Sequence, residues 1–528
     1  MTNVSPAHGS PDLPEPTTSP VESTTGADVE HCIRVLAALV SEPKALAQIP
    51  EERRRELLIL AGKLSRPLRH ERERVTKAIR RYQRKIDQRA DLELRQATQI
   101  RDARAVPGVN ESATRLLPRL ATEPRRADSF AEERELKFAQ NCYICKRDYT
   151  ELHHFYDSMC PDCAELNYRK RTQTANLDGR IALVTGARIK IGYHISLMLL
   201  RAGARVVATT RFPNDAAARY AREPDYEAWR ARLTLYGLDL RFCPSVELFA
   251  SHLLESLPRL DFLINNAAQT VHRPNGFFAH LRPFEDTPIE QLPEQVRPLL
   301  AMHHELAKQH QLTRGEAPDA SPIVATAGLG VALPSLFGPA ATVGDEDRIH
   351  FPPGRFDADG QQLDLRHNNS WRMKAADVST PELIEVHLVN AIAPFILVAR
   401  SKELMARTPT GDKHVVNVSA MEGVFARYTK SDRHPHTNMA KASLNMLTRT
   451  AAKDYVLDGI HMNSVDTGWV TDEDPHPHAQ RKQREYDFSP PLDAIDGAAR
   501  VCDPIFTGFQ TGEHPYGQFF KDYRPSAW

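Results

Sequence analysis

The sequence predicts an α/β fold for residues 177–528, a doubly wound parallel sheet with helices on both faces. Short apolar segments alternate there with longer segments whose apolar residues recur at helical spacing. A glycine-bearing turn joins the first apolar segment to the first helical one. Both observations are typical of parallel sheets, in which a helix connects each strand to the next.

The expected elements follow one another in a regular order. Apolar runs predict strands at residues 181–184, 205–210, 233–238, 260–265, 415–419 and 462–465. Helical spacing predicts helices at residues 191–201, 246–257, 289–311, 383–405, 439–456 and 494–506. Residues 271–378 form an insertion between the fourth and fifth strands. Its place at the carboxyl edge of the sheet predicts part of a substrate pocket or a lid.

The composition changes several times before residue 177. Residues 1–28 are rich in Pro, Ser and Thr and poor in large apolar residues, which predicts a disordered tail. Residues 29–105 form a charged helical segment, residues 106–138 a linker and residues 139–170 a small cysteine-bearing module.

The charge of the chain is balanced as a whole but not locally. Its 528 residues include 68 Lys and Arg and 68 Asp and Glu, which excludes a globally basic nucleic-acid binder. Residues 51–105 carry 17 Lys and Arg against 9 Asp and Glu, with a thin apolar stripe that includes Val75 and Ile79. We interpret this segment as a solvated helix whose stripe packs on the protein. The alternative is a contact with an acidic partner. No base-reading motif accompanies it, so nucleic acid is not expected.

The N-terminus and the cysteines predict a reducing, cytoplasmic setting. The first ten residues, MTNVSPAHGS, lack the positive start and apolar run of a secretory signal. No stretch approaches the roughly 20 apolar residues of a membrane span, so no membrane partner is expected. Three of the seven cysteines are scattered, which is not the pattern of a disulfide framework.

Four cysteines form two CxxC pairs with 14 residues between them. Zn²⁺ prefers four soft ligands in a tetrahedron, and each CxxC turn supplies two thiolates. We therefore expect a closed structural zinc site whose ligands are Cys142, Cys145, Cys160 and Cys163. The alternative is four reduced thiols in a core.

Four segments have the form of a dinucleotide site. Residues 181–192, IALVTGARIKIG, run from a strand through a turn into a helix, where backbone amides can approach a pyrophosphate. The next strand ends in Thr-Thr-Arg211, a later one is followed by Asp239-Leu240, and the fourth by Asn265-Asn266-Ala267-Ala268. Together these segments resemble the short-chain dehydrogenase/reductase family, with its TGxxxGxG and NNAG motifs. Lys190 replaces the middle glycine of the first motif and Ala268 the glycine of the second.

The resemblance implies a nicotinamide cofactor. A further segment, Asn463 to Thr471, resembles the family's N-x-x-x-P-G-x-V-x-T sequence over the nicotinamide, with Thr467 in place of proline. The implied cofactor-binding residues are Thr185, Gly186, Arg188, Lys190, Ile191, Gly192, Arg211, Asp239, Leu240, Asn266, Ala267, Lys441, Thr467, Gly468 and Val470. An acidic residue after the second strand is typical of NAD sites and an arginine of NADP sites. Arg211 without an acid favours NADP over NAD.

The catalytic part of the resemblance is incomplete. The family uses an asparagine, a serine, a tyrosine and a lysine, and Asn390, Ser419 and Lys441 match three of them. Thr437 stands where the tyrosine is expected, four residues before the lysine. A phenol titrates near pH 10 and a neighbouring ammonium lowers its pKa, whereas a threonine alcohol does not titrate in the accessible range.

Three interpretations of this substitution remain open. Tyr428, nine residues before Thr437, acts as the acid; His434 or His436 supplies the proton; or the domain no longer performs the usual carbonyl chemistry. In the proposed mechanism Ser419 and Thr437 hold the substrate oxygen, while Lys441 binds the nicotinamide ribose. Asn390 supports a water-linked proton path.

The leading hypothesis is an NADP-preferring oxidoreductase that transfers a hydride to or from a carbonyl or alcohol-type small molecule. The resemblance also implies a homo-oligomer formed through the Rossmann domain. The alternative is a catalytically altered or inactive dinucleotide-binding regulatory protein in which residues 28–165 recognise a protein partner. No motif in the insertion identifies the substrate.

Overall fold

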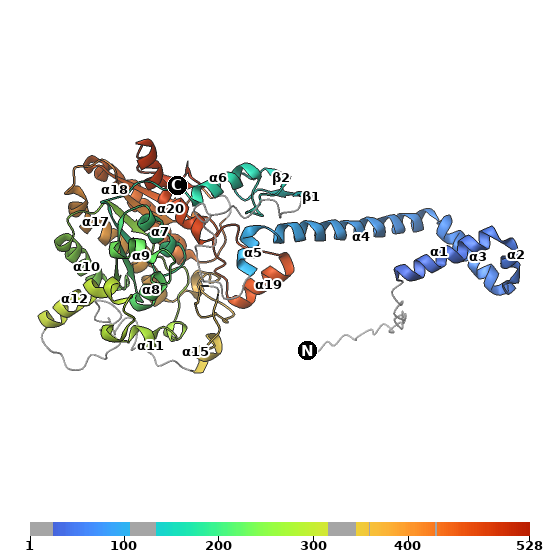
Figure 1. Cartoon of the computed structure of the whole chain (residues 1–528), viewed down its shortest axis with the longest axis horizontal. Coiled ribbons are helices and arrows are strands. Elements are labelled where there is room, and N and C mark those ends of the chain that lie inside the picture. Colours follow the sequence, from blue (N-terminus) through green and yellow to red (C-terminus); the bar gives the residue numbers. More distant parts are fainter. Residues whose placement is uncertain (1–24, 106–133, 315–344, 358, 428–429) are drawn as a thin grey trace, which may run out of the picture. The chain divides into compact units, whose positions relative to one another are not determined.

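The computed structural model describes residues 25–105, 134–314, 345–357, 359–427 and 430–528 (Figure 1). The chain divides into two units, Met1–Asp87 and Gln88–Trp528. The candidate site lies in the second unit, and the first consists of helices in its described part.

An eight-stranded sheet forms the centre of the second unit, in the order β10-β9-β8-β7-β6-β3-β4-β5. Its strands are β3 (Ile181–Thr185), β4 (Arg205–Thr210), β5 (Leu233–Gly237), β6 (Phe262–Asn265), β7 (Lys413–Ser419), β8 (Ile460–Asp466), β9 (Phe519–Lys521) and β10 (Arg524–Ser526). All pairs are parallel except β9 with β10. The chain order reverses between β3 and β6, where α/β sheets open a ligand crevice. The predicted fold class is confirmed.

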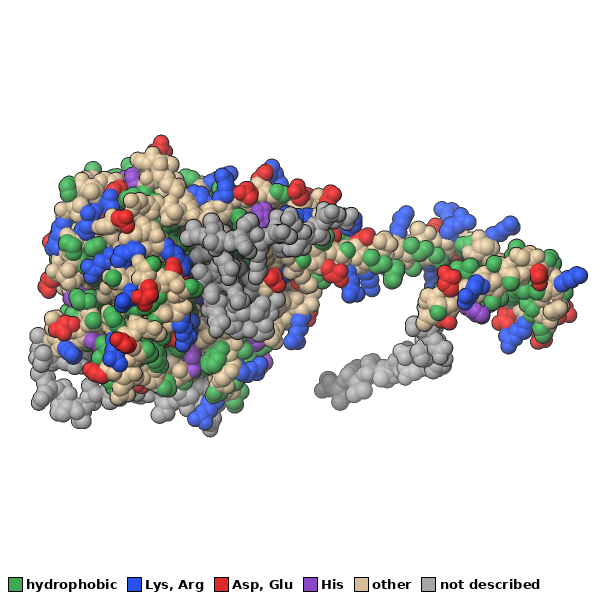
Figure 2. All heavy atoms as spheres, viewed as in Figure 1, with side chains coloured by type: hydrophobic (Ala, Val, Ile, Leu, Met, Phe, Trp, Pro, Cys, Tyr) green, Lys and Arg blue, Asp and Glu red, His purple; other side chains and the backbone are tan. Residues whose placement is uncertain are grey.

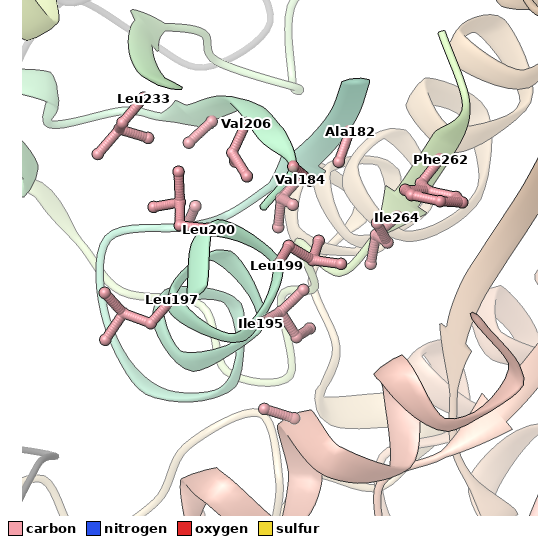
Figure 3. Close-up of a cluster of buried hydrophobic side chains, with 14 of the residues drawn as sticks. Ala182, Val184, Ile195, Leu197, Leu199, Leu200, Val206, Leu233, Phe262 and Ile264 are labelled. Carbon is pink, nitrogen blue, oxygen red and sulfur yellow. The ribbon is translucent and has the colours of Figure 1, made fainter. Parts of the chain in front are cut away.

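Helices cover both faces of the sheet. One apolar core joins the strands to α7 (Lys190–Arg201), α8 (Pro213–Tyr220) and α20 (Ala494–Thr511). The other joins them to α10 (Cys243–Ser256), α17 (Ala393–Ala406) and α18 (Pro435–Tyr455). Figure 3 shows Leu199 and Leu200 of α7 pointing toward the side chains of β3 and β4. Because both faces are covered, the strands are continuous apolar runs rather than alternating ones.

Several boundaries differ from those expected. The helix predicted at residues 289–311 is a short turn at Ile289–Gln291 followed by α12 (Arg297–Arg314), because Pro293 interrupts the helical spacing. Neither α8 nor α19 (His476–Tyr486) was expected from the sequence. Other described elements of the insertion are short: Asn275–Phe278, α11 (Arg282–Glu285), α15 (Asp345–His350) and Ala375–Asp377.

The helix expected at residues 383–405 extends continuously over Thr380–Ala406, through α16 (Thr380–His387), a π-helical turn (Leu388–Ile392) and α17. By length and composition it could cross a membrane, with a mean hydropathy of 1.7. The expectation that no stretch approaches a membrane span was therefore too strict. Part of this helix lies in the core of the second unit, where Leu397 and Val398 pack beside β7, and 44% of its apolar window is buried.

The first unit is helical and charged. It contains α1 (Gly26–Ser41), α2 (Pro43–Gln48), α3 (Glu51–Ser65) and most of α4 (Arg69–Gln96). Thr25 caps α1 through a capping box with Asp28, so helix begins inside the predicted tail, whose residues 1–24 lie outside the described part. Figure 2 shows blue Lys and Arg beside green apolar side chains along α4, where Ile79 and Tyr82 are exposed.

A cysteine module precedes the sheet. It consists of α5 (Gln99–Ala105), a hairpin of β1 (Glu135–Asn141) and β2 (Asp148–Glu151), and α6 (Pro161–Arg171). The buried Asp91 carboxylate of α4 accepts the backbone N–H groups of Lys137 and Phe138 at 2.7 and 3.0 Å, which joins the end of α4 to this hairpin. Strand β1 begins inside the predicted linker, whose residues 106–133 are not described.

Candidate active site

The turn after β3 leaves no room for side chains. Gly186 has φ +69°, and a Cβ there would lie 2.8 Å from the Cα of Ala267. A Cβ on Gly192 would lie 2.3 Å from both Asn266 Nδ2 and the Gly186 oxygen. Only glycine fits either position, and the bare backbone at the start of α7 suits a pyrophosphate.

Thr185 and Asn266 tie this turn to the end of β6. Thr185 Oγ1 accepts hydrogen bonds from the backbone N–H groups of Asn266 and Ala267, at 3.1 and 3.0 Å. In return, Asn266 Nδ2 donates to the backbone oxygens of Thr185 and Gly186, at 3.0 and 3.2 Å. The two predicted motifs therefore meet at the point where the strand order reverses.

Arg211 follows β4, and Arg241 lies four residues after the neighbouring strand β5. The guanidinium of Arg211 lies 4.6 Å from the ring centroid of Phe278. Burial and the neighbouring charge of Arg241 lower the pKa of Arg211 to about 10. Arg241 binds the Asp239 carboxylate and donates to Glu385 at 3.0 Å. Arg241 is thus offset by the Asp239 and Glu385 carboxylates, which leaves Arg211 as the cation of this region without an ion pair among the described residues. Leu240 is buried beside it. Sequence reasoning missed Arg241, although its place two residues after Asp239 was a usable signal.

Lys441 and Ser419 lie at the carboxyl end of β7. Lys441, in α18, donates from Nζ to the backbone oxygen of Val418 at 2.7 Å. Burial lowers the pKa of Lys441 to about 8. In the described part of the chain, the buried hydroxyls of Ser419 and Thr437 have no hydrogen-bond partner. Unsatisfied buried hydroxyls are uncommon and suit a site that a polar ligand completes.

Asn390 occupies the π-helical turn between α16 and α17. Its Oδ1 accepts the Gln269 N–H at 2.6 Å and its Nδ2 donates to the Gln269 oxygen at 2.9 Å. The side chain is fully buried. It therefore fixes the segment that follows Asn266 and Ala267, and π-helical turns of this kind are frequent at functional sites.

The segment after β8 crosses the same edge of the sheet. Asp466 lies opposite Ser419 in the β7–β8 register, and burial raises the pKa of its carboxyl to about 6. Thr467 follows it, and Gly468 has φ +75°. A Cβ on Gly497 would meet Ile191 at 2.9 Å and Val470 at 3.2 Å, so the segment reaches the start of α7.

Two family models match separate segments of the chain, and both matches extend into the insertion at residues 271–378. The "short chain dehydrogenase" model matches residues 180–292, and the "Enoyl-(Acyl carrier protein) reductase" model matches residues 357–488. The chain belongs to the short-chain dehydrogenase/reductase family.

Relatives match the chain to different extents. The "Uncharacterized protein R665" of Acanthamoeba polyphaga mimivirus is 32% identical over 410 residues, 72% of this chain and 74% of that protein. Human "Dehydrogenase/reductase SDR family member 13" is 45% identical over 94 residues, and the match spans only 24% of its length. A solved structure, the "Pseudomonas aeruginosa RhlG/NADP active-site complex", is 17% identical and covers 65% of this chain and 95% of that chain, with a TM-score of 0.40.

This member of the short-chain dehydrogenase/reductase family departs from the family motif at the phosphate turn. Lys190, in place of a glycine, has φ +54°, a left-handed conformation that costs a non-glycine residue roughly 1 kcal/mol. Burial alone would lower the pKa of Lys190, but the carboxylate of Glu473 and two aspartates outweigh it and raise the pKa. Arg188, expected near phosphate, is buried and paired with Asp215 at 2.8 Å. Of these two cations, Lys190 rather than Arg188 is therefore the candidate for binding phosphate.

The second departure concerns the missing tyrosine. His434, the N-cap residue of α18, stacks on Trp371 with ring centroids 4.0 Å apart. His436 is buried, with Nε2 3.6 Å from Glu382 Oε1, and neither ring nitrogen has a hydrogen-bond partner among the residues described. Tyr428 lies outside the described residues. Of the three candidate proton donors, His436 is the one adjacent in sequence to Thr437.

The third departure is the cysteine module, which lies outside both matched segments. The sulfur atoms of Cys142, Cys145, Cys160 and Cys163 all lie within 4.8 Å of one another. A tetrahedral zinc site places its sulfur atoms ~3.8 Å apart, so these four residues fit the ion. The pKa of Cys145 is lowered to about 6 because the Arg147 side chain donates a hydrogen bond to its sulfur.

Proposed function

We propose that this chain is an NADP-preferring oxidoreductase acting on a carbonyl or alcohol-type small molecule. The observation that carries the proposal is the arrangement at the end of β7: Lys441 is buried against Val418, and the hydroxyls of Ser419 and Thr437 lack partners in the described structure. When bound, the dinucleotide supplies a hydride from its nicotinamide C4 to the substrate carbon.

The preference for NADP rests on charge at the end of β4. A 2′-phosphate needs a cationic donor, and Arg211 supplies one at the end of β4, beside Arg241, which is already bound by Asp239 and Glu385. Asp239, the carboxylate of this region, is bound by Arg241 at 2.6 Å and so is a poor acceptor for a ribose hydroxyl. We therefore expect NAD to bind more weakly than NADP.

The chain's own groups divide the remaining work. Ser419 and Thr437 donate hydrogen bonds to the substrate oxygen, and the Lys441 ammonium binds the ribose hydroxyls. Asn390 holds Gln269 and so keeps the crevice wall in place. In the reductive direction His436, whose Nε2 lies 3.6 Å from Glu382 Oε1, gives its proton to the substrate oxygen as the hydride arrives at carbon.

The test of this assignment compares two histidines of the same helix start. His436→Gln is expected to lower kcat for NADPH-dependent reduction of a carbonyl panel about 100-fold, with NADPH affinity unchanged. His434→Gln is the matched control, because His434 stacks on Trp371, and is expected to keep kcat within a few-fold. If the two variants had the same kcat, His436 would not be the proton donor, and Tyr428 would become the favoured candidate.

A dinucleotide-binding regulatory protein is the second candidate. Thr437 favours it, because threonine cannot replace the acid chemistry of tyrosine. This candidate predicts that the wild-type chain binds NADPH but turns over no carbonyl or alcohol. Lys441→Ala would then change only cofactor-linked binding of a protein partner.

Three further proposals concern metal, setting and assembly. We propose structural Zn²⁺ at the four-cysteine cluster, and a reducing, cytoplasmic setting, in which thiolates of this kind remain available to a metal ion. We also propose a homo-oligomer through α17 and α18, where Phe395 and Met439 are more than half exposed. Metal analysis and the solution mass of the purified chain test the first and last.

A further inference from the structure

The segment from Asp466 to Glu473 spans the candidate crevice from the catalytic serine to the phosphate turn. At one end Asp466 pairs in register with Ser419. At the other, Glu473 accepts hydrogen bonds from Thr471 Oγ1 at 2.6 Å and Thr270 Oγ1 at 3.3 Å, and it faces the charge of Lys190. We call residues 466–473 the crossing loop. A contact that fixes the middle of the crossing loop therefore affects the position of both its ends, one beside Ser419 and the other facing Lys190.

The cysteine module makes such a contact. Tyr143 lies inside the first CxxC pair, and its Oη accepts the backbone N–H of Trp469 at 2.9 Å. A Cβ added to Gly468 would lie 3.3 Å from the same oxygen. The tyrosine thus reaches from between two zinc-ligand candidates to the centre of the crossing loop, 326 residues away in sequence.

The module is anchored firmly enough to transmit this contact. The buried guanidinium of Arg171 in α6 donates to Asp493 and Asp496 at the start of α20, at 2.8 Å each. Arg500 of α20 donates to Asn167 of α6 at 2.6 Å. Fully buried, multiply bonded arginines hold two elements in one geometry, because separating them would leave unpaired charges. The two helices therefore place Tyr143 reproducibly.

Zinc would extend this rigidity to Tyr143 itself. The turn that carries Tyr143 is defined by Cys142 and Cys145, and the four sulfur atoms already lie within 4.8 Å of one another. A structural zinc ion contributes its binding energy to the folding of the turn that ligates it. Loss of the ion would release the turn and with it the hydrogen bond to Trp469.

We propose that the cysteine module is part of the dinucleotide site, with Tyr143 as a positioning residue. Zinc at the four cysteines fixes Tyr143, Tyr143 fixes the backbone of Trp469, and the crossing loop is thereby held in the conformation that binds the dinucleotide. Zinc retention and dinucleotide affinity are thus coupled, and by linkage each ligand must strengthen the other's binding. This inference rests on the proposed function, since it requires the crevice to take a dinucleotide.

The experiment compares Tyr143→Phe with Tyr149→Phe in the full chain. Tyr149 belongs to the same module, is buried, and donates to the Asp157 backbone oxygen at 2.8 Å without touching the crossing loop. Each variant therefore removes one hydrogen bond of a tyrosine hydroxyl in the module, but only Tyr143→Phe removes a bond to the crossing loop. Measured quantities are the NADPH Kd by nucleotide fluorescence, zinc per chain, and the rate of zinc loss to a chelator with and without NADPH.

We expect Tyr143→Phe to keep its zinc and to bind NADPH about fivefold more weakly, the effect of losing one hydrogen bond. NADPH should slow zinc loss in the wild type and in Tyr149→Phe but not in Tyr143→Phe. A purely structural tyrosine would not abolish this protection selectively.

Three other outcomes overturn the inference. Equal NADPH affinity and equal protection in both variants would show that Tyr143 does not position the loop. Loss of zinc in Tyr143→Phe alone would make the residue part of the metal module only. Failure of the wild type to bind NADPH would overturn the proposed function, whereas normal wild-type binding with an unaffected Tyr143→Phe variant overturns this inference alone.

Discussion

Lys441 Nζ donates a 2.7 Å hydrogen bond to the backbone oxygen of Val418, the residue before Ser419. This bond places a buried ammonium beside the end of β7, where the cost of burial lowers its pKa to about 8. The site therefore contains a cation whose charge changes within a pH range that is easily measured.

NADPH affinity should depend on the charge of Lys441. Because the pKa of Lys441 is about 8, the ammonium is lost as the pH rises through that value, and NADPH should bind progressively more weakly above it. Fluorescence titrations with NADPH between pH 6.5 and 9.5 measure this dependence. If binding requires one proton on Lys441, the affinity should fall by at most roughly tenfold for each pH unit above the pKa. Lys441→Arg, whose charge persists, should lack the inflection.

The same shift has a consequence for stability. An unfolded lysine keeps its proton up to about pH 10.4, so between the two pKa values the unfolded chain binds more protons than the folded one. Lys441 therefore adds a contribution to the free energy of unfolding that increases with pH across this window. A flat difference between wild type and Lys441→Met, followed by urea unfolding from pH 7 to 10, would argue against it.

Arg211→Ala should lower the preference for NADP. Removal of the guanidinium beside the end of β4 is expected to weaken NADPH binding about tenfold and to leave NADH binding within about twofold, because only NADPH carries the 2′-phosphate. Arg205→Ala is the control, since Arg205 lies on the same strand and is exposed at the opposite end. Parallel losses for NADPH and NADH would mean that Arg211 supports the fold rather than the phosphate.

Gly192→Ala should damage the phosphate turn. The added Cβ would lie 2.3 Å from Asn266 Nδ2 and from the Gly186 oxygen, so the turn must open. We expect the free energy of unfolding to fall by about 1–3 kcal/mol. NADPH affinity should fall by more than about tenfold. Gly411→Ala, whose Cβ meets nothing within 4 Å, should bind and unfold like the wild type. Calorimetric titration and urea unfolding measure both quantities.

Cys160→Ser should remove zinc and loosen the module. One of four sulfur ligands is lost, and the binding energy of the ion is folding energy for this segment. Metal analysis should find no zinc, and limited proteolysis should cut within residues 134–171. Cys32→Ser, which changes an exposed cysteine of α1, should retain both properties. Unchanged zinc content and protease pattern in Cys160→Ser would refute the metal site.

Local patterns were enough to predict the sheet. The segment Ile181–Thr185 is an apolar strand because both its faces are buried, and such a run is visible without tertiary information. The glycine turn after it could also be predicted, because its glycines lie close together in the chain. Gly186 and Gly192 are needed there, since neither position has room for a Cβ. Prolines at 293 and 298 were visible too, but their effect on the predicted helix was underestimated.

The partners of the site residues were not predictable in the same way. The sequence marked Arg188 and Lys190 alike as phosphate candidates, but packing paired Arg188 with Asp215 and left Lys190 facing Glu473. No sequence pattern in α8, which carries Asp215, or in the loop that carries Glu473 predicts these contacts.

By itself, the sequence determined the α/β architecture, the family motifs and the four-cysteine cluster, because each depends on residues close together in the chain. Only the tertiary structure decided that His436 meets Glu382 and that Tyr143 meets Trp469, 326 residues away. Those contacts depend on how α18 packs on α16 and how the cysteine module packs on α20. Packing of this kind is the sum of many weak contacts across the whole core, and no local pattern encodes it.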